Sequence, residues 1–328
     1  MSSTFYPSYD DVIAAGERVA PYVRRTPLVQ SEHLSRLTGG EIYLKLECWQ
    51  TLGAFKVRGM VNRVLALPPE QRGWPLVVAS SGNHGIAASW CGHRWGLEVH
   101  VFAPRTTPRT KLAKIERYGA RTHLCGDNYD QAHAAAWAHL CAHGHQAVWV
   151  DSGSDPLAIA GHGTIGLELA TDLPDLHEVL VPVGSGGLMT GIGLVMRELL
   201  PRARVTGIQT EACPAMLASL RDGVCHDVYP NEPSLCEALV GGVGRIPFEM
   251  ADANIDRVVL APEGAIAKAV PQLLEQEQVL AEPSGAIGWA YVASYPEEFR
   301  GRRVAVVVSG SNIDYGVLCR LVAGCEPG

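Results

Sequence analysis

Apolar residues recur along the chain in two alternating patterns: short continuous runs, and longer stretches at helical spacing. The short runs predict strands at Ile42–Glu47, Val77–Ser80, Val99–Ala103, Thr122–Leu124, Val148–Val150, Val179–Val183, Val205–Gln209, Arg257–Leu260 and Val304–Val308. Helical spacing lies between them, at Asp10–Ala20, Phe55–Leu67, Gly85–Trp95, Pro108–Tyr118, Tyr129–Cys141, Gly187–Leu200, Ala215–Asp222, Gly264–Gln276 and Gly285–Tyr295. This alternation predicts an α/β fold with mainly parallel sheets.

The section from 74 to 150 forms a self-contained run of strand–helix alternation. We expect it to be a small domain inserted into a larger one built from residues 1–73 and 151–328. A length of 328 residues suits two such domains.

Composition narrows the function classes. The formal net charge is −7, whereas nucleic-acid-binding proteins are typically basic, so the composition argues against that class. The apolar runs are strand-sized and too short to span a membrane. The nine cysteines are scattered without a CxxC pair, and no signal peptide precedes them, so we expect a cytoplasmic protein with reduced thiols.

Three segments carry candidate chemistry. In Gly53–Gly59, Lys56 lies at a helix start among small and apolar residues, where helix N–H groups and low dielectric favour a nucleophilic amine. A solvated lysine on an amphipathic helix is the alternative. The segment Ser80–Gly85 follows a strand and opens a helix, so it suits a carboxylate or a phenolate, or is an ordinary N-cap turn.

The third segment is the glycine-rich loop Val183–Leu188, which again joins a strand to a helix. Glycines allow a phosphate to approach the backbone, and the helix N-terminus favours its charge. A dinucleotide site is the alternative, but the third glycine is Gly187 and does not fit that fingerprint. The last strand ends in Val308–Asn312, where a hydroxyl could bond a heteroaromatic nitrogen.

In this order and at these separations, the motifs resemble the fold-type II pyridoxal-phosphate (PLP) enzymes, in particular the threonine/serine dehydratases and serine racemases. The resemblance covers nearly the whole chain and extends to Arg25–Leu28, Lys45–Glu47, Ala160–Thr164 and Glu282–Gly285. It implies a tryptophan synthase β-like fold: two three-layer α/β domains with mainly parallel sheets and PLP in the cleft between them.

The resemblance also gives each candidate residue a role. Lys56 would hold PLP as a Schiff base and, once freed, remove the Cα proton. The other expected cofactor contacts are Phe55 at the ring, Asn83 at its phenolic oxygen, Ser309 at the pyridine nitrogen, Glu282 nearby, and Gly184, Ser185, Gly186, Gly187 and Leu188 at the phosphate. The substrate carboxylate is expected at Ser80, Ser81, Asn83 and His84. Ser81 is also a candidate catalytic residue on the opposite face of Cα.

The expected function is a PLP-dependent ammonia-lyase, a dehydratase that performs β-elimination on a β-hydroxy amino acid. The substrate is threonine, serine or a bulkier analogue, and the products are a 2-oxo acid and ammonia. A homodimer is the expectation from the family. The alternatives are an amino-acid racemase, a β-replacement enzyme and a catalytically silent PLP-binding homologue.

No metal site is expected. Gln209, Thr210 and Ala215 stand where the racemase-like members carry acidic metal ligands. Several residues cluster near one predicted helix end without the spacing of a zinc site: His133, His139, Cys141, His143 and His145.

Overall fold

The computed structural model describes residues 5–142, 144 and 146–324. In this part of the chain, a six-stranded sheet has the order β1-β2-β10-β7-β8-β9. All neighbouring pairs are parallel except β1 and β2, which are antiparallel. The strands are β1 (Leu28–Gln30), β2 (Glu41–Lys45), β7 (Glu178–Pro182), β8 (Arg204–Thr210), β9 (Arg257–Ala261) and β10 (Arg303–Val307).

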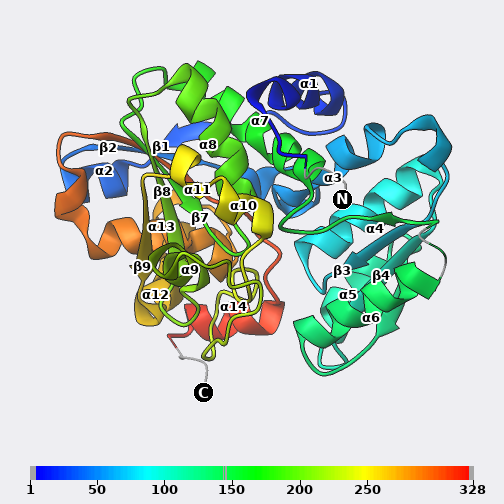
Figure 1. Cartoon of the computed structure of the whole chain (residues 1–328). Helices are drawn as coiled ribbons and strands as arrows, with labels where there is room; N and C mark the ends of the chain where they lie inside the picture. Colours follow the sequence, from blue (N-terminus) through cyan, green and yellow to red (C-terminus); the bar gives the residue numbers. More distant parts are fainter. Residues whose placement is uncertain (1–4, 143, 145, 325–328) are drawn as a thin grey trace.

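A second sheet, with four parallel strands in the order β5-β4-β3-β6, lies to the right in Figure 1. Its strands are β3 (Leu76–Ala79), β4 (Val99–Ala103), β5 (Arg121–Leu124) and β6 (Val148–Trp149). The prediction of an α/β fold with mainly parallel sheets is therefore confirmed.

Helices connect the strands throughout. They are α1 (Tyr9–Val19), α2 (Glu32–Thr38), α3 (Lys56–Leu65), α4 (Asn83–Trp95), α5 (Arg109–Glu116), α6 (Tyr129–Ala142), α7 (Pro156–Asp172), α8 (Gly187–Leu199), α9 (Ala215–Asp222), α10 (Arg245–Glu249), α11 (Ala251–Asn254), α12 (Glu263–Glu277), α13 (Pro283–Ser294) and α14 (Tyr315–Val322). Short 3₁₀ turns lie at Glu47–Trp49, Thr51–Gly53, Pro69–Gln71 and Pro296–Phe299.

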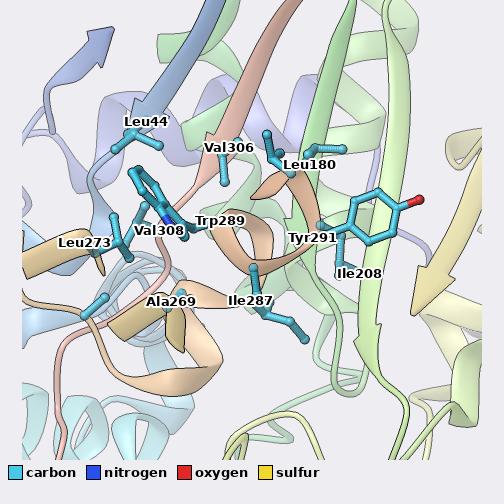
Figure 2. Packing of buried hydrophobic residues seen from close by; sticks show 14 of the residues in the cluster. Leu44, Leu180, Ile208, Ala269, Leu273, Ile287, Trp289, Tyr291, Val306 and Val308 are labelled. Atoms are coloured by element: carbon cyan, nitrogen blue, oxygen red, sulfur yellow. The ribbon is translucent and has the colours of Figure 1, made fainter. Parts of the chain in front are cut away.

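Both faces of the six-stranded sheet are covered by helices. On one face, the fully buried Trp289 of α13 packs with Leu44 of β2, Val306 of β10 and Leu273 of α12 (Figure 2). Its indole N–H donates to the side chain of Gln272 at 3.1 Å, so the ring is buried without an unpaired polar atom. The opposite face packs against α7 and α8, which makes this part of the molecule three layers thick.

The four-stranded sheet is also covered on both faces. One face packs against α6. On the other face, Val57 and Met60 of α3 lie in the same apolar cluster as Val78 of β3 and Ile86 of α4. The helix that begins with Lys56 is thus held by the core of the smaller sheet, although it precedes that sheet in sequence.

The 17-residue helix α7 is the largest element that the sequence pattern does not predict. It is buried along most of its length, so it lacks the polar face that marks an amphipathic helix. Its glycines are needed for close packing: a Cβ on Gly161 would lie 2.6 Å from the carbonyl oxygen of Arg58, and one on Gly163 would lie 2.8 Å from that of Gly191. In the sequence these glycines look like loop signals, whereas in the structure they let α3 and α8 approach α7.

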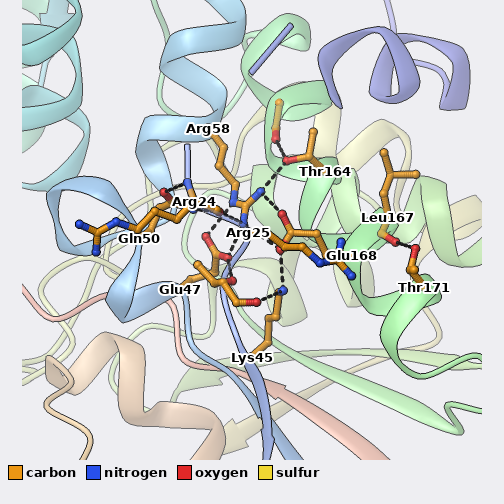
Figure 3. Close-up of polar contacts among 12 residues, drawn as sticks. Arg24, Arg25, Lys45, Glu47, Gln50, Arg58, Thr164, Leu167, Glu168 and Thr171 are labelled. Carbon is orange, nitrogen blue, oxygen red and sulfur yellow. Dashed lines mark hydrogen bonds and ion pairs between the residues drawn. The ribbon is translucent and has the colours of Figure 1, made fainter. Parts of the chain in front are cut away.

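A buried network of charges joins α3 and α7 to the strand β2 (Figure 3). The guanidinium of Arg58, 1% exposed, donates two hydrogen bonds of 2.8 Å to the carboxylate of Glu47 and one of 2.7 Å to Glu168. Lys45 donates to the second oxygen of Glu168 at 2.5 Å, and Thr26 donates to Glu47 at 2.5 Å. Although burial opposes it, Arg58 and Lys45 hold the pKa of Glu168 below its usual value. Every charge in the network is therefore paired.

Replacing Arg58 with Met is expected to lower the free energy of unfolding by about 3–5 kcal/mol, because it leaves the buried Glu47 without its cationic partner and Glu168 with Lys45 alone. The unfolding midpoint in urea measures this loss. The control is Arg25→Ala, which removes the exposed ion pair with Asp172 and should cost no more than about 1 kcal/mol. Equal losses in the two variants would show that the buried network does not stabilise the fold.

Candidate active site

The structure gathers all the predicted site residues around one cavity of about 940 Å³. The cavity lies beyond the carboxyl ends of β3, β7 and β10, where open α/β sheets place their ligands. The predicted residues that line it are Phe55, Lys56, Ser80, Ser81, Asn83, His84, Gly184, Ser185, Gly186, Gly187, Leu188, Glu282 and Ser309.

Lys56 is the first residue of α3, and its amine reaches the cavity. Burial lowers the pKa of this amine to about 8, against an opposing effect of the Asp151 carboxylate, which raises it. The Nζ atom donates a hydrogen bond of 3.0 Å to the carbonyl oxygen of Ser152 and lies 5.2 Å from the centre of the Phe55 ring. At neutral pH the ammonium form of an amine with this pKa still predominates, but its uncharged fraction is far larger than that of an ordinary lysine, so it can act as a nucleophile or a base.

The glycine-rich loop between β7 and α8 forms a cradle of backbone. Gly186 has a φ of +100°, and a Cβ there would lie 2.6 Å from the Cβ of Pro247 and 2.7 Å from the Cε of Met216. Gly187 begins α8, whose first-turn N–H groups have no partner within the helix. Such a helix start binds anions, and a phosphate is the most common of them.

On another wall of the cavity, amides and a carboxyl form a chain of hydrogen bonds. The Asn83 side chain donates to Glu282 at 2.7 Å and accepts from the amide of Asn312 at 2.7 Å. Burial raises the pKa of Glu282 above its usual value. Ser309 follows β10 and is 5% exposed, and its carbonyl oxygen accepts from the N–H of Phe55 at 3.1 Å. The end of β10 is thereby tied directly to the residue before Lys56.

The segment Ser80–Gly85 turns from β3 into α4. The N–H of Gly82 donates to the Ser80 hydroxyl at 3.1 Å, and α4 begins at Asn83. Burial and the nearby Lys56 lower the pKa of His84 to about 4, so its ring is neutral. Its Nε2 lies 2.9 Å from the carbonyl oxygen of Val150 and donates to it. Ser81 lines the same cavity.

These residues fit pyridoxal phosphate. Lys56 offers a buried amine for its aldehyde, and the loop of Gly186 offers the backbone cradle that a phosphate requires. Asn83 can contact a ring oxygen, and Ser309 can contact a ring nitrogen from the end of β10. The cavity volume of about 940 Å³ leaves room for an amino acid beside the cofactor.

Sequence reasoning missed other residues that line the cavity. Tyr129 comes from the start of α6, and burial followed by the Asp151 carboxylate raises the pKa of its hydroxyl to about 12. Ser152 follows β6, where the rule for carboxyl ends of parallel strands would have pointed to it. Lys111 reaches the cavity from α5 and pairs with Glu237. No motif of the sequence marks Tyr129 or Lys111.

Among the described residues there is no group of three or more His, Cys, Asp or Glu side chains that could hold a metal ion. Of the clustered candidates, His143 and His145 lie outside the described residues. Gln209 accepts from the backbone N–H of Leu217 at 3.0 Å, and Thr210 donates to Glu263. None of the helices in the described ranges is long and apolar enough to cross a membrane.

Residues 19–310 match the model of the pyridoxal-phosphate-dependent enzyme family. The chain therefore belongs to this family, as the amine and the glycine cradle indicate.

Within the family, the chain resembles enzymes of two kinds. It is 40% identical over 314 residues to the L-threonine ammonia-lyase of Thermotoga maritima, which covers 95% of this chain and 77% of that protein. It superimposes on maize serine racemase with a TM-score of 0.88 at 28% identity, covering 98% of both chains. The processed form of threonine deaminase isoform 2 from Solanum lycopersicum gives a TM-score of 0.88 at 27% identity, covering 97% of this chain and 94% of that one. The resemblance to the dehydratase and serine racemase group is thus confirmed.

Replacing Gly186 with Ala is expected to raise the dissociation constant of PLP at least about tenfold, because the new Cβ strains the backbone and displaces the cradle. Titrating PLP into the variant and following its absorbance measures the change. The control is Gly223→Ala, where φ is also positive, at +66°, but no heavy atom lies within 4 Å of the new Cβ. Similar weakening in both variants would argue against a phosphate site at this loop.

Proposed function

We propose that this enzyme is a PLP-dependent ammonia-lyase that acts on a β-hydroxy amino acid and releases a 2-oxo acid and ammonia. The observation that carries the proposal is the Lys56 amine: it is buried, its pKa is about 8, and it shares one cavity with the glycine-rich loop of Gly186 and the start of α4. The 40% identity to the L-threonine ammonia-lyase of Thermotoga maritima supports this class of reaction.

When bound, PLP supplies an electron sink for the bonds at the substrate Cα. Lys56 would hold the cofactor and, after release, take the Cα proton, since burial lowers the pKa of its amine to about 8 and so enlarges the uncharged fraction near neutral pH. Its hydrogen bond to the carbonyl oxygen of Ser152 fixes one N–H and limits the directions in which the nitrogen lone pair can point. The Cα proton would thus be taken up by the Lys56 Nζ atom in a defined position.

The start of α4 would bind the substrate carboxylate. The N–H groups of the first turn of α4 have no partner within the helix, and Asn83 and His84 line the cavity there. The hydroxyls of Ser80 and Ser81, which line the same cavity, would add donors. His84 adds no charge of its own, because burial and the nearby Lys56 keep its ring neutral, and its Nε2 is already hydrogen-bonded to the Val150 carbonyl. Ser309 would meet the pyridine nitrogen with a neutral hydroxyl, which favours expulsion of a β-substituent over storage of negative charge in the ring.

A racemase is the second candidate, because Ser81 lines the same cavity and could exchange a proton on the face of Cα opposite Lys56. The similarity to the structure of maize serine racemase favours keeping this candidate. A silent PLP-binding protein is less favoured, since the lysine, Asn83 and the glycine-rich loop all line one cavity. β-Replacement within the same fold is a further alternative.

We also infer the setting in which the enzyme works. Residues 1–73 and 151–328 would form the larger, PLP-binding domain, and residues 74–150 the smaller, substrate-side domain. Scattered cysteines without CxxC pairs support a cytoplasmic protein. A homodimer is proposed from the resemblance to the family alone.

Lys56→Ala is expected to abolish covalent PLP binding and to lower release of 2-oxo acid and ammonia more than about 10³-fold, because the variant lacks both the anchoring amine and the base. Both products are measured with a panel of β-substituted amino acids in each enantiomer. The control, Lys268→Ala, removes an exposed lysine on α12 and should leave both rates unchanged. Product release by the Lys56 variant at the wild-type rate would overturn the proposal.

Ser81→Ala separates the two candidate reactions. A lyase that uses Ser81 only for binding should keep its elimination rate within about tenfold, which corresponds to the loss of one hydrogen bond. A racemase should instead lose inversion of Cα in this variant. The measurement is chiral chromatography of recovered substrate after turnover in D₂O. Inverted, deuterated substrate from the wild type and none from the variant would favour the racemase.

A further inference from the structure

A turn directly after β6 holds the Lys56 amine from the side of the smaller sheet. The Asp151 carboxylate accepts hydrogen bonds from the N–H groups of Gly153 at 2.8 Å and Ser154 at 2.6 Å, both through its Oδ1 atom. This closes the turn around Ser152 and presents the Ser152 carbonyl oxygen to Lys56, 3.0 Å from Nζ. The side chain of Asp151 thus determines where the acceptor for the amine lies.

The turn is also fixed from its other side. A Cβ on Gly153 would lie 2.6 Å from the Cβ of Ser185, so the turn packs directly on the glycine-rich loop. A Cβ on Gly244 would lie 2.8 Å from the carbonyl oxygen of Gly153. The turn therefore cannot move away from Lys56 without also losing its packing against the predicted phosphate cradle.

The charge of Asp151 faces groups from several elements. Lys56 of α3, His84 of α4, Tyr129 and His133 of α6, and Asp155 at the start of α7 all interact with it electrostatically. His133 pairs with it directly, with Nε2 at 3.6 Å from Oδ2. Although burial opposes ionisation, His133 and the two backbone N–H groups lower the pKa of Asp151, so it stays charged.

We propose that Asp151 is a positioning residue for Lys56: its side chain holds the Ser152 carbonyl oxygen against the amine, and its negative charge retains part of the amine as ammonium. The proposal rests on the function inferred above for Lys56. The amine must accept a proton from Cα and later give it up, so it works best when both of its forms are populated at the working pH. Burial alone would drive it toward the neutral form, and the Asp151 charge counteracts this.

The test uses full-length protein from which PLP has been removed. Capture of added PLP by Lys56 is followed by absorbance from about pH 6 to about pH 10, a range that brackets the lowered pKa of about 8 on both sides. Capture needs the neutral amine, so its rate rises with pH to a plateau, and the midpoint reports the pKa of Lys56. No substrate is involved, so the result stands even if the lyase reaction proposed above is wrong.

Two variants separate the charge from the geometry. Asp151→Asn keeps an oxygen for the two backbone N–H groups but removes the charge, so the midpoint should shift to lower pH by roughly 0.5–1 unit, with the plateau rate within about twofold. Asp151→Ala also opens the turn, so the plateau rate should fall about tenfold. The control is Asp130→Asn on α6, an exposed acid near His133 that does not bond the turn.

An Asp151→Asn midpoint equal to that of Asp130→Asn would overturn the electrostatic part. A wild-type plateau in a folded Asp151→Ala variant, checked by circular dichroism, would overturn the positioning part. If Asp151→Ala does not fold, the midpoint of Asp151→Asn still decides whether the charge acts on Lys56.

Discussion

The buried guanidinium of Arg58 is the interaction on which the site depends. It lies two residues beyond Lys56 in α3, and it binds Glu47 beside β2 and Glu168 in α7. The start of α3 is therefore fixed both to the larger sheet and to helix α7, and the Lys56 residue at this start is fixed with it. Because a buried charge without partners is costly, any shift of α3 that breaks these bonds is strongly opposed. Because the first turn of α3 is held rigidly, the position of the Lys56 amine is well defined.

Much of this arrangement was predictable from the sequence. Strands that end in Ala79, Pro182 and Val307 belong to parallel pairs, and the carboxyl ends of parallel strands are where such sheets place their ligands. The residues after them line one cavity, as the order of the motifs indicated. The roles of these residues in binding PLP and substrate remain predictions. The family resemblance, rather than any one motif, connected the lysine with the loops.

Other features could not be predicted from the sequence. Helix α7 is buried nearly all round and carries glycines for close packing, so neither its periodicity nor its composition indicates a helix. The hydrogen bond from the Lys56 side chain goes to the backbone carbonyl of Ser152, 96 positions away, and the residue type that supplies this carbonyl does not reveal it. The place of Tyr129 in the cavity depends on how α6 lies against the smaller sheet. Such contacts follow from packing, which a local pattern does not describe.

The pairing of β3 with β6 has a consequence for how this architecture can vary. Leu76 lies beside Val148 in that pair, so the chain enters the smaller sheet on one strand and leaves it on the neighbouring one. The segment between them closes on itself like a cassette, and the register of the six-stranded sheet does not depend on its length. Insertions in the loops of this segment far from α3 and from the turn after β6 would therefore leave the six-stranded sheet unchanged, whereas changes at its packing against α3 would also disturb the anchoring lysine.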